Sequence, residues 1–396
     1  MIYQYKALKT NAQLDINLTF DKDEKIFCMI GKNGVGKTLL LENMIKSIIF
    51  NHSIFGANEE MQYKDYFNIQ EIKTLLLTSK LLLPKTIEIN NNLIKDDKDS
   101  SSAWGEEKFY NIHRARISNH EIFDKPFLYI GAPGRGYVKN VNSNNLKILE
   151  TNHVRLARSI LSTMSYLEGN NQINDSVSSW FFSRLVVNPA FISVHASYKE
   201  DINTVLNLLG HLDEKYKVIL DKDNHISVPI HFDDGKIFFG NTPIDKLPSG
   251  YVSLIKIFQS IVDCYSSFGV KNFKEAEGVI FIDEIEAHLH VQWQIKIIPL
   301  LKEFFPKTSF YITTHSPIIL SGLKTGEAYE LYQENDTLKN KKIRNIESYV
   351  LNDLIFDIFN VDINDSKLNN NDKKANEIKR ASLIKFLAEI DAEEVL

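Results

Sequence analysis

The distribution of apolar residues predicts an α/β protein with a buried parallel sheet. Three short runs are apolar almost throughout, at residues 25–30, 278–282 and 309–313. A continuous apolar run is typical of a strand that is buried on both faces, as the strands of a parallel sheet are. We expect the last two runs to be neighbours in such a sheet, so that the polar residues that follow them meet at one edge.

Helical and strand-like patterns extend over the rest of the chain. Residues 131–136 form a Gly/Pro-rich turn after one predicted strand, where Arg135 either approaches a phosphate or belongs to an ordinary turn. We interpret the polar stretch 90–107 as a loop, and expect another polar linker after 359. The predicted helices cover residues 39–45, 72–83, 146–168, 201–213, 252–262 and 378–390. The remaining predicted strands cover residues 127–130, 217–220, 226–230, 236–239, 329–332 and 349–359.

The octet at residues 31–38 fits the pattern G-x-x-x-x-G-K-[ST] of a nucleotide phosphate loop. Its glycines allow the backbone to turn tightly and to present N–H groups to phosphate oxygens. A strand precedes the octet and a helix follows it, so the phosphates would lie at a helix N-terminus. We expect Lys37 to reach the β- and γ-phosphates of ATP and Thr38 to hold Mg²⁺. The nucleotide-binding residues are Gly31, Lys32, Asn33, Gly34, Val35, Gly36, Lys37 and Thr38.

Two carboxylates, Asp283 and Glu284, directly follow the apolar run at 278–282. At the carboxyl end of a parallel strand they would face the crevice where ligands bind. We predict that Asp283 holds Mg²⁺ and that Glu284 is the general base for the attacking water.

Two further segments complete the predicted site. His315 follows the strand at 309–314, where it could contact the γ-phosphate or the attacking water, and Pro317 then begins a helix. Ser249 and Gly250 open the helix at 252–262 and offer a second anion site. A second phosphate-binding helix is useful if it serves the nucleotide of a neighbouring subunit.

In this order the four segments resemble the ATP-binding-cassette class of P-loop ATPases, in the branch of the SMC, RecF and overcoming-lysogenization-defect proteins. Residues 247–251 (LPSGY) stand where that class has its signature, residues 282–290 (IDEIEAHLH) resemble its Walker B and D-loop run, and residues 313–317 (TTHSP) resemble its His switch. Residues 1–27 resemble its opening β-hairpin. The resemblance covers about residues 1–50 and 245–325.

The resemblance implies an α/β P-loop NTPase of ABC/SMC head type with an inserted helical lobe. It also implies a head-to-tail dimer with two ATP molecules, each held by one subunit's phosphate loop and the other subunit's Ser249 and Gly250. Two features depart from the class. Pro248 stands where the class usually has a small polar residue. The glutamine that senses Mg²⁺ in the class cannot be assigned to one position, because Gln62 and Gln70 are equal candidates.

Four divisions of the chain follow from these matches. Residues 1–60 and 241–330 form the two parts of the ATPase domain. Residues 61–240 form the inserted, mostly helical lobe with a hairpin, and residues 331–396 a C-terminal extension. The insert shows no sustained heptads, so we expect no coiled-coil arms.

Composition sets the outer limits. The chain has 396 residues, of which 43% are hydrophobic, enough for a substantial core. Its two cysteines lie in apolar runs, which is typical of a reduced, cytoplasmic protein. No apolar stretch approaches the roughly 20 residues that span a bilayer, so we expect no membrane partner. The net charge of −5 does not favour a nucleic-acid partner, although the basic clusters at 113–116, 339–344 and 373–380 leave a groove for DNA or RNA open.

No effector chemistry is evident beside the ATPase motifs. The tail is too short for a TOPRIM-type nuclease domain, and His288 and His290 lack the partners that a zinc site needs. Compact ATPases of this kind resemble the ATPase subunits of the Septu, retron-associated and PARIS anti-phage systems, in which a separate protein carries the toxic activity. The sequence thus predicts an ATPase that senses or switches as a homodimer or higher homo-oligomer. Its predicted partners are a separate nuclease or toxin as effector and a nucleic acid or phage protein as trigger. A RecF-like repair ATPase is the alternative, and a transporter ATPase fits less well.

Overall fold

The computed structural model describes residues 1–8, 10, 14–49, 52, 84, 86–95, 123–136, 152–167, 177–185, 196–214, 219–220, 226–227, 230–233 and 236–348. The chain divides into two compact units, Met1–Glu347 and Ser348–Leu396. The fold and the site below belong to the first unit.

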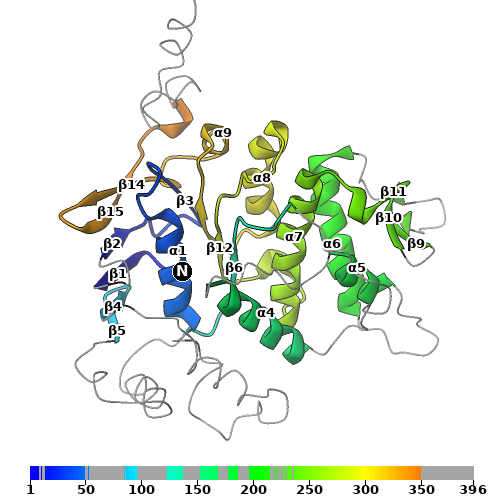
Figure 1. Ribbon diagram of the computed structural model, residues 1–396, viewed down its shortest axis with the longest axis horizontal. Coiled ribbons are helices and arrows are strands. Elements are labelled where there is room, and N and C mark those ends of the chain that lie inside the picture. Colours follow the sequence, from blue (N-terminus) through cyan, green and yellow to red (C-terminus); the bar gives the residue numbers. More distant parts are fainter. Residues whose placement is uncertain are drawn as a thin grey trace, which may run out of the picture. The chain divides into compact units, whose positions relative to one another are not determined.

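In the described residues the largest sheet has ten strands, in the order β5-β4-β1-β2-β15-β14-β3-β13-β12-β6 (Figure 1). Five neighbours, β14, β3, β13, β12 and β6, run parallel to one another, whereas hairpins make up the other side. The strands are β1 (Gln4–Leu8), β2 (Asp15–Thr19), β3 (Ile26–Ile30), β4 (Thr86–Ile89), β5 (Asn92–Lys95), β6 (Phe127–Ile130), β12 (Val279–Ile282), β13 (Ser309–Thr313), β14 (Ala328–Glu334) and β15 (Thr337–Lys342).

The three apolar runs are the central strands β3, β13 and β12, and every residue of the three is buried. They lie side by side, as buried parallel strands must to satisfy their backbone groups. The predicted α/β class is therefore confirmed, and so is the opening hairpin of β1 and β2.

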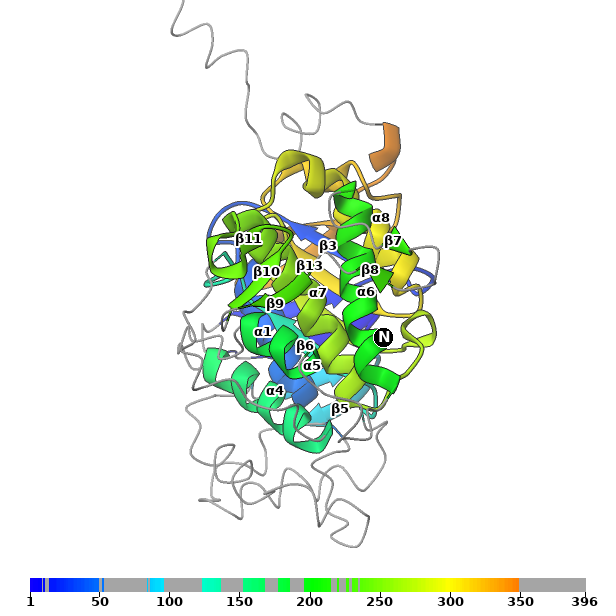
Figure 2. The same cartoon turned by 90° about the vertical axis from the view of Figure 1, so that its right-hand side faces the viewer.

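Helices pack against this sheet and against one another (Figures 1 and 2). Helix α1 contacts β6 and β13, and α7 contacts β6, α4, α5 and α6. The helices are α1 (Lys37–Ile49), α4 (Asn152–Leu167), α5 (Val177–Leu185), α6 (Ala196–Leu212), α7 (Ser249–Ser267), α8 (Val291–Phe304) and α9 (Pro317–Leu320). Two small sheets complete the described elements: β7 (Ile219–Leu220) with β8 (Ile226–Ser227), and β9 (Ile230–Asp233), β10 (Lys236–Phe239) and β11 (Thr242–Pro243).

The region between residues 61 and 240 differs from the expectation of a separate lobe. Strand β6 pairs in parallel with β12, and the hairpin of β4 and β5 extends the far side of the sheet through β1. The apolar sequence Phe127–Ile130 explains the first pairing, because all four side chains are buried between layers. Helices α4, α5 and α6 then pack beside α7. The limits of 61–240 themselves remain a prediction.

Other predicted elements fare unequally. The helices at 201–213 and 252–262 and the strand at 236–239 are confirmed. The described residues of the predicted strand at 226–230 belong to two strands, β8 and the start of β9, and it is β9 that forms a hairpin with β10. The interpretation of 90–107 as a loop throughout was wrong because β5 lies at its start. Helices α5 and α8 and strand β15 were not foreseen. The segments predicted at 72–83, 349–359 and 378–390, together with Gln62 and Gln70, lie outside the described residues.

Three helices of the lobe, α4, α5 and α6, meet α7 of the ATPase domain at a buried cluster of charges. Arg155 of α4 and Arg184 of α5 both donate to Oδ1 of Asp263 of α7, at 2.6 Å and 2.5 Å. The Nε of Arg184 also donates to Asp201 of α6, at 3.1 Å. Since the cluster joins α4, α5, α6 and α7, it fixes these four helices to one another.

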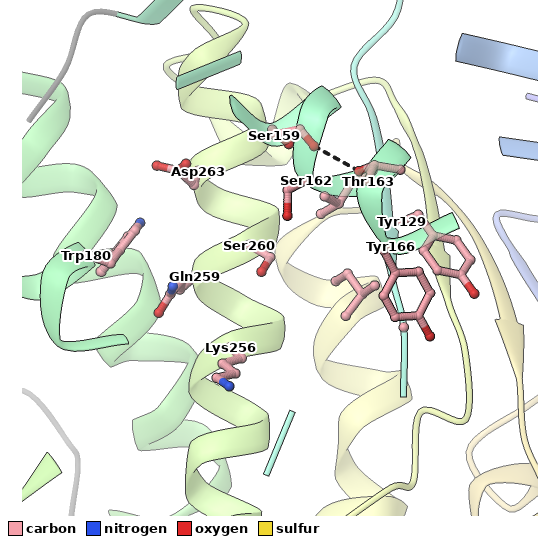
Figure 3. Close-up of a pocket in the computed structure, with 13 residues that line it drawn as sticks. Tyr129, Ser159, Ser162, Thr163, Tyr166, Trp180, Lys256, Gln259, Ser260 and Asp263 are labelled. Carbon is pink, nitrogen blue, oxygen red and sulfur yellow. Dashed lines mark hydrogen bonds between the residues drawn. The ribbon is translucent and has the colours of Figure 1, made fainter. Parts of the chain in front are cut away.

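A small polar cavity lies beside this cluster, between β6, α4, α5 and α7 (Figure 3). Its volume is about 80 Å³, which suits a few water molecules of about 30 Å³ each. Trp180 Nε1 and Gln259 Oε1, which have no hydrogen-bond partner among the described residues, line it.

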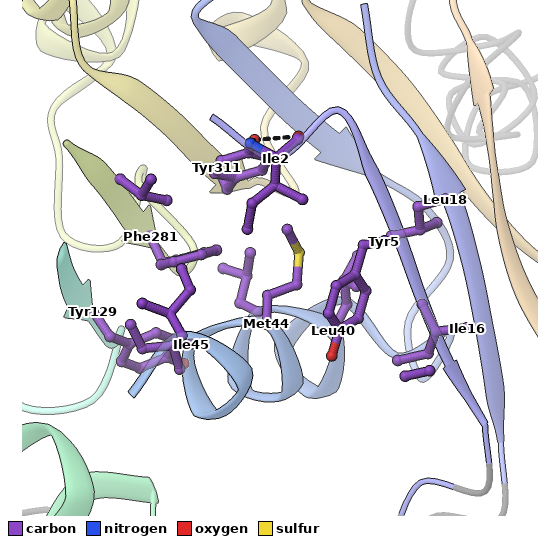
Figure 4. Packing of buried hydrophobic residues seen from close by; sticks show 14 of the residues in the cluster. Ile2, Tyr5, Ile16, Leu18, Leu40, Met44, Ile45, Tyr129, Phe281 and Tyr311 are labelled. Atoms are coloured by element: carbon purple, nitrogen blue, oxygen red, sulfur yellow. Dashed lines mark hydrogen bonds between the residues drawn. The ribbon is translucent and has the colours of Figure 1, made fainter. Parts of the chain in front are cut away.

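The core lies between α1 and the sheet (Figure 4). Leu40, Met44 and Ile45 of α1 point toward the sheet, at the spacing that puts them on one helix face. At the centre of the sheet, the hydroxyl of Tyr311 donates to the carbonyl oxygen of Ile2 and accepts from its N–H at 2.8 Å. This pair ties the N-terminal segment to β13 and so holds the hairpin side of the sheet to the parallel side.

Candidate nucleotide site

The phosphate loop runs from the end of β3 into α1. Gly34 and Gly36 have φ of 78° and 106°, in the left-handed region that favours glycine. Glycine is required at position 31 for a steric reason, because a Cβ there would lie 2.8 Å from the carbonyl oxygen of Leu331 on β14. The loop conformation therefore depends on the glycines that the motif specifies.

Lys37 folds back over this loop. Its ammonium donates to the carbonyl oxygens of Gly31, at 2.7 Å, and Lys32, at 3.1 Å. Burial lowers the pKa of Lys37, and the carboxylates of Asp283, Glu284 and Glu286 raise it in part. The cation thus lies among three acidic groups at the end of the sheet, where a phosphate would compete for it.

Thr38 and Asp283 are brought together although 245 residues separate them. The hydroxyl of Thr38 donates to Oδ2 of Asp283 at 2.9 Å. Thr313, at the end of β13, donates to Oδ1 of the same carboxylate, and the N–H of Asp283 donates to the carbonyl oxygen of Ile130, at 2.9 Å. The two residues predicted to hold Mg²⁺ thus share one position at the carboxyl edge of the sheet.

Glu284 has a backbone conformation that is uncommon for a residue with a side chain. Its φ is 45°, and hydrogen bonds hold the peptide groups on both sides. Its N–H donates to the hydroxyl of Thr313 at 2.8 Å, and its carbonyl oxygen accepts from the N–H of Ala287, also at 2.8 Å. Strained backbone of this kind is concentrated at functional sites, where the surrounding structure enforces it.

His315 lies on the loop after β13, next to the loop after β12. Glu286 accepts from the N–H of His315, at 2.6 Å, and from the hydroxyl of Thr314, at 2.7 Å. The His315 side chain is exposed, and its ring makes no hydrogen bond or ion pair with other described residues. Glu286 therefore fixes the backbone of this loop and leaves the imidazole accessible.

Ser249 and Gly250 form the first turn of α7, with Pro248 as N-cap. A Cβ on Gly250 would lie 2.7 Å from the carbonyl oxygen of His288 and 2.9 Å from the ring of Trp293. The absence of a side chain at this position is thus needed within the chain itself. Among the described residues, no hydrogen bond joins Ser249 or Gly250 to the phosphate loop.

Sequence reasoning assigned no role to Thr313 and Glu286. Thr313 orients Asp283, and Glu286 holds the segment of His315. Both could have been found from one signal: a polar side chain at, or just after, the carboxyl end of a central strand lies at the same edge as the predicted site.

The donor set of this site suits Mg²⁺ that binds together with a phosphate. Within the described part of the chain, no group of three or more His, Cys, Asp and Glu side chains could hold a metal ion by itself. Mg²⁺ is commonly bound by one or two protein oxygens plus substrate phosphates and water. Thr38 and Asp283 supply two such oxygens next to the phosphate loop.

Comparison with known proteins identifies relatives among ATPases. A family model described as AAA ATPase domain matches residues 137–320. A Septu protein PtuA from Bacillus mycoides (strain KBAB4) is 26% identical over 345 residues, which are 85% of this chain and 40% of that protein. A Retron Vc95 probable ATPase from Vibrio cholerae serotype O1 biovar El Tor is 24% identical over an alignment 388 positions long that covers 85% of this chain and 73% of that protein.

Among solved structures, the SMC head domain from Thermotoga maritima is similar over 87% of this chain and 99% of that one, with 12% identity and a TM-score of 0.38. Residues 137–320 of this chain are therefore similar to an AAA ATPase domain. Its relatives include a Septu protein and a retron probable ATPase, which confirms these two parts of the resemblance inferred from the motifs.

One further finding concerns membranes. None of the helices that the structure describes is long and apolar enough to cross a bilayer.

Proposed function

We propose that this protein is the ATP-hydrolysing switch of a bacterial anti-phage defence system. It acts in the cytoplasm, dimerises around ATP and controls a separate effector, which is a nuclease or a toxin. The nucleotide contacts, the trans role of Ser249 and Gly250 and the effector are parts of this proposal.

One observation carries the catalytic half of the proposal. Thr38 and Asp283 lie 2.9 Å apart at the carboxyl edge of the sheet, with Lys37 beside them and Glu284 next along the chain. This is the arrangement that phosphoryl transfer needs, because the reaction relies on positioned positive charge and a positioned water molecule.

Each residue then has one task. The N–H groups of the phosphate loop and the ammonium of Lys37 bind the phosphates of ATP, and Glu284 accepts a proton from the attacking water. Thr38 and Asp283 would hold Mg²⁺, which neutralises charge on the transferred phosphate. His315, with an accessible ring on the neighbouring loop, would orient the water or the γ-phosphate.

The position of the signature supports dimerisation. Ser249 is exposed at the N-terminus of α7, where free N–H groups favour an anion, yet it makes no hydrogen bond to its own phosphate loop in the described structure. Such a site is useful if the phosphate comes from another subunit. A symmetric dimer would then place two nucleotides between the subunits.

The defence role rests on the relatives and on the resemblance of the motifs to Septu and retron-associated systems. The chain spans only 40% of the Septu protein from Bacillus mycoides, so the activity and partners of that whole protein enter here as a proposal.

The test is purification of this chain with the product of its neighbouring gene. We expect ATP hydrolysis, an ATP-dependent dimer of Glu284→Gln by light scattering, and a complex with the neighbouring protein that changes with the nucleotide. The chain alone should leave plasmid, tRNA and phage DNA uncut.

Two results would overturn the proposal. Nucleic-acid cleavage by the chain alone that is lost in Asp283→Ala would make this chain the effector. Salt-dependent DNA affinity of the isolated chain, without a protein partner, would favour the RecF-like alternative.

A further inference from the structure

The geometry points to Arg135 as a positioning residue for Glu284, through hydrogen bonds from its guanidinium to the backbone at Asp283 and Glu284. This inference rests on the proposed ATP hydrolysis at this site and adds a residue to it. Sequence analysis left Arg135 open between a phosphate ligand and an ordinary turn residue.

The position of Arg135 follows from the register of two strands. Ile130, the last residue of β6, pairs in parallel with Ile282, the last residue of β12. The loops after the two strands therefore begin side by side, and the N–H of Asp283 donates to the carbonyl oxygen of Ile130. The loop at 131–136 thus delivers Arg135 to the segment that carries the two catalytic carboxylates.

Arg135 contacts the backbone of this segment and not the phosphate loop. Its NH1 donates to the carbonyl oxygen of Asp283 at 2.7 Å, and its NH2 donates to that of Glu284. The side chain is fully buried, so it cannot reach outward to a phosphate. Burial lowers the pKa of Arg135 to about 10, with Asp283, Glu286 and Glu284 acting in the opposite direction, and the group stays a cation at neutral pH.

The contacts explain how Glu284 keeps its uncommon backbone conformation. The φ of 45° requires support from outside the residue. The Thr313 hydroxyl accepts from its N–H, the Ala287 N–H donates to its carbonyl oxygen, and Arg135 supplies the third hydrogen bond from the loop after β6. Without Arg135 the carbonyl oxygen of Glu284 loses its only side-chain donor among the described residues. The backbone from which the Glu284 carboxylate projects is then held less firmly.

The cost of this arrangement also suggests a role beyond stability. The Nε of Arg135 is buried without a hydrogen-bond partner among the described residues. An unsatisfied buried donor is unfavourable, and a role in function is one explanation for such a group in a native structure. A residue that served packing alone would be replaced at less cost by an apolar side chain of similar volume.

The loop that carries Arg135 is itself fixed from two sides. Lys256 of α7 donates to the carbonyl oxygen of Gly134 at 2.7 Å. A Cβ on Gly136 would lie 2.9 Å from the ring of His288, so this glycine lets the two loops pack closely. Arg135 is therefore held by the helix that begins with the signature residues.

The experiment compares Arg135→Met and Arg135→Lys with Arg184→Lys. Arg184 is a matched control, because it is equally buried but donates to carboxylates in the helical lobe. For Arg135→Met we expect kcat to fall about tenfold to a hundredfold, the loss typical of a misplaced catalytic group, with ATP affinity retained. Arg135→Lys, which keeps the charge, should retain more of kcat and covers the case in which the Met variant does not fold. Arg184→Lys should lower the melting temperature and leave kcat unchanged.

A double-mutant cycle decides whether Arg135 acts through Glu284. If it does, Arg135→Met should reduce kcat no further when Glu284 is already Gln. Independent factors that multiply, or equal losses of kcat and ATP affinity, would overturn the inference.

Hydrogen exchange gives a readout that does not depend on activity. The amides of residues 284–287 should exchange faster in Arg135→Met than in the parent, and not in Arg184→Lys. Unchanged exchange there would refute the role of Arg135. A parent protein that hydrolyses no more ATP than Lys37→Ala would instead refute the proposed function.

Discussion

Buried arginines occur at two regions of this molecule, and they differ in what they contact. At the nucleotide site Arg135 donates to two backbone carbonyl oxygens, whereas in the helical lobe Arg155 and Arg184 donate to the carboxylates of Asp201 and Asp263. The first contact determines the path of one catalytic segment, and the second joins four helices. A buried arginine therefore positions a backbone segment in the first region, whereas buried arginines hold helices together in the second.

This difference in contacts predicts that substitutions in the two regions affect different properties, the rate of ATP hydrolysis in one region and the stability of the fold in the other. Changes at the carboxyl edge of the sheet should alter turnover and leave the unfolding transition nearly unchanged. Changes at the charge cluster should do the reverse. Each variant below tests one side of this separation.

The largest effect is expected at the catalytic edge. Glu284→Gln should bind ATP but lower kcat by about two to four orders of magnitude, because the attacking water loses its general base. Lys37→Ala should lose ATP binding itself, since the phosphates lose their cation. Turnover by steady-state ATPase assay and affinity by a fluorescent nucleotide distinguish the two. Equal rates for Glu284→Gln and the parent would remove Glu284 from the mechanism.

A large effect on stability is expected from Asp263→Ala. This change leaves the buried Arg155 and Arg184 with one carboxylate between them, and breaking buried pairs in this way destabilises by about 3 kcal/mol. The midpoint of urea unfolding measures it. Glu275→Gln, which breaks only the exposed pair with Lys307, is the control and should leave the midpoint unchanged. A loss of kcat in folded Asp263→Ala would contradict the separation of the two regions.

Substitutions at Gly250 and Ser249 distinguish an effect on the stability of the monomer from an effect on dimerisation. Gly250→Ala should destabilise the monomer by about 1–3 kcal/mol, because the added Cβ meets the carbonyl oxygen of His288. Ser249→Glu should leave the monomer stable, since an acid suits a helix N-terminus. Its charge should nevertheless repel the partner's phosphates and abolish the ATP-dependent dimer seen by light scattering. A normal dimer in Ser249→Glu would show that α7 does not act in trans.

The smallest expected effect concerns Lys256, which lies between the two regions. Burial lowers the pKa of Lys256 from 10.5 to about 8 in the folded protein. The unfolded state then binds more protons between these values, so this group makes the folded state more stable as pH rises from about 8 to 10.5. Relative to Lys256→Met, the parent should gain about 1 kcal/mol over this range after allowance for solvent screening. A pH-independent difference between the two unfolding free energies would contradict the shift.

Much of the fold could be predicted because its signals are local. The runs at β3, β12 and β13 are apolar throughout, and the phosphate loop needs particular residue types at fixed spacing. Strand β5 was missed because its sequence, Asn92–Lys95, is half polar and forms only when β4 is beside it. Helix α8 was missed because it carries Pro299.

The site shows the same division between local and long-range information. Lys37, Thr38, Asp283 and Glu284 are recognisable because each stands in a motif next to its strand. Arg135 and Thr313 are not, because their roles depend on which strands flank β12. The register that aligns Ile130 with Ile282 is a property of the sheet and not of either segment alone.

The sequence by itself therefore determined the local motifs of the candidate site: residues that fit a nucleotide phosphate loop, two carboxylates after a buried strand, and a helix that opens with Ser249 and Gly250. Only the tertiary structure decided how that chemistry is held. The hydroxyl of Thr38 meets Asp283 across 245 residues, and the guanidinium of Arg135 reaches the backbone of Glu284 from the loop after β6. The physical reason is that a motif fixes backbone and side-chain types over a few residues, whereas the packing of parallel strands brings together residues that no local pattern relates.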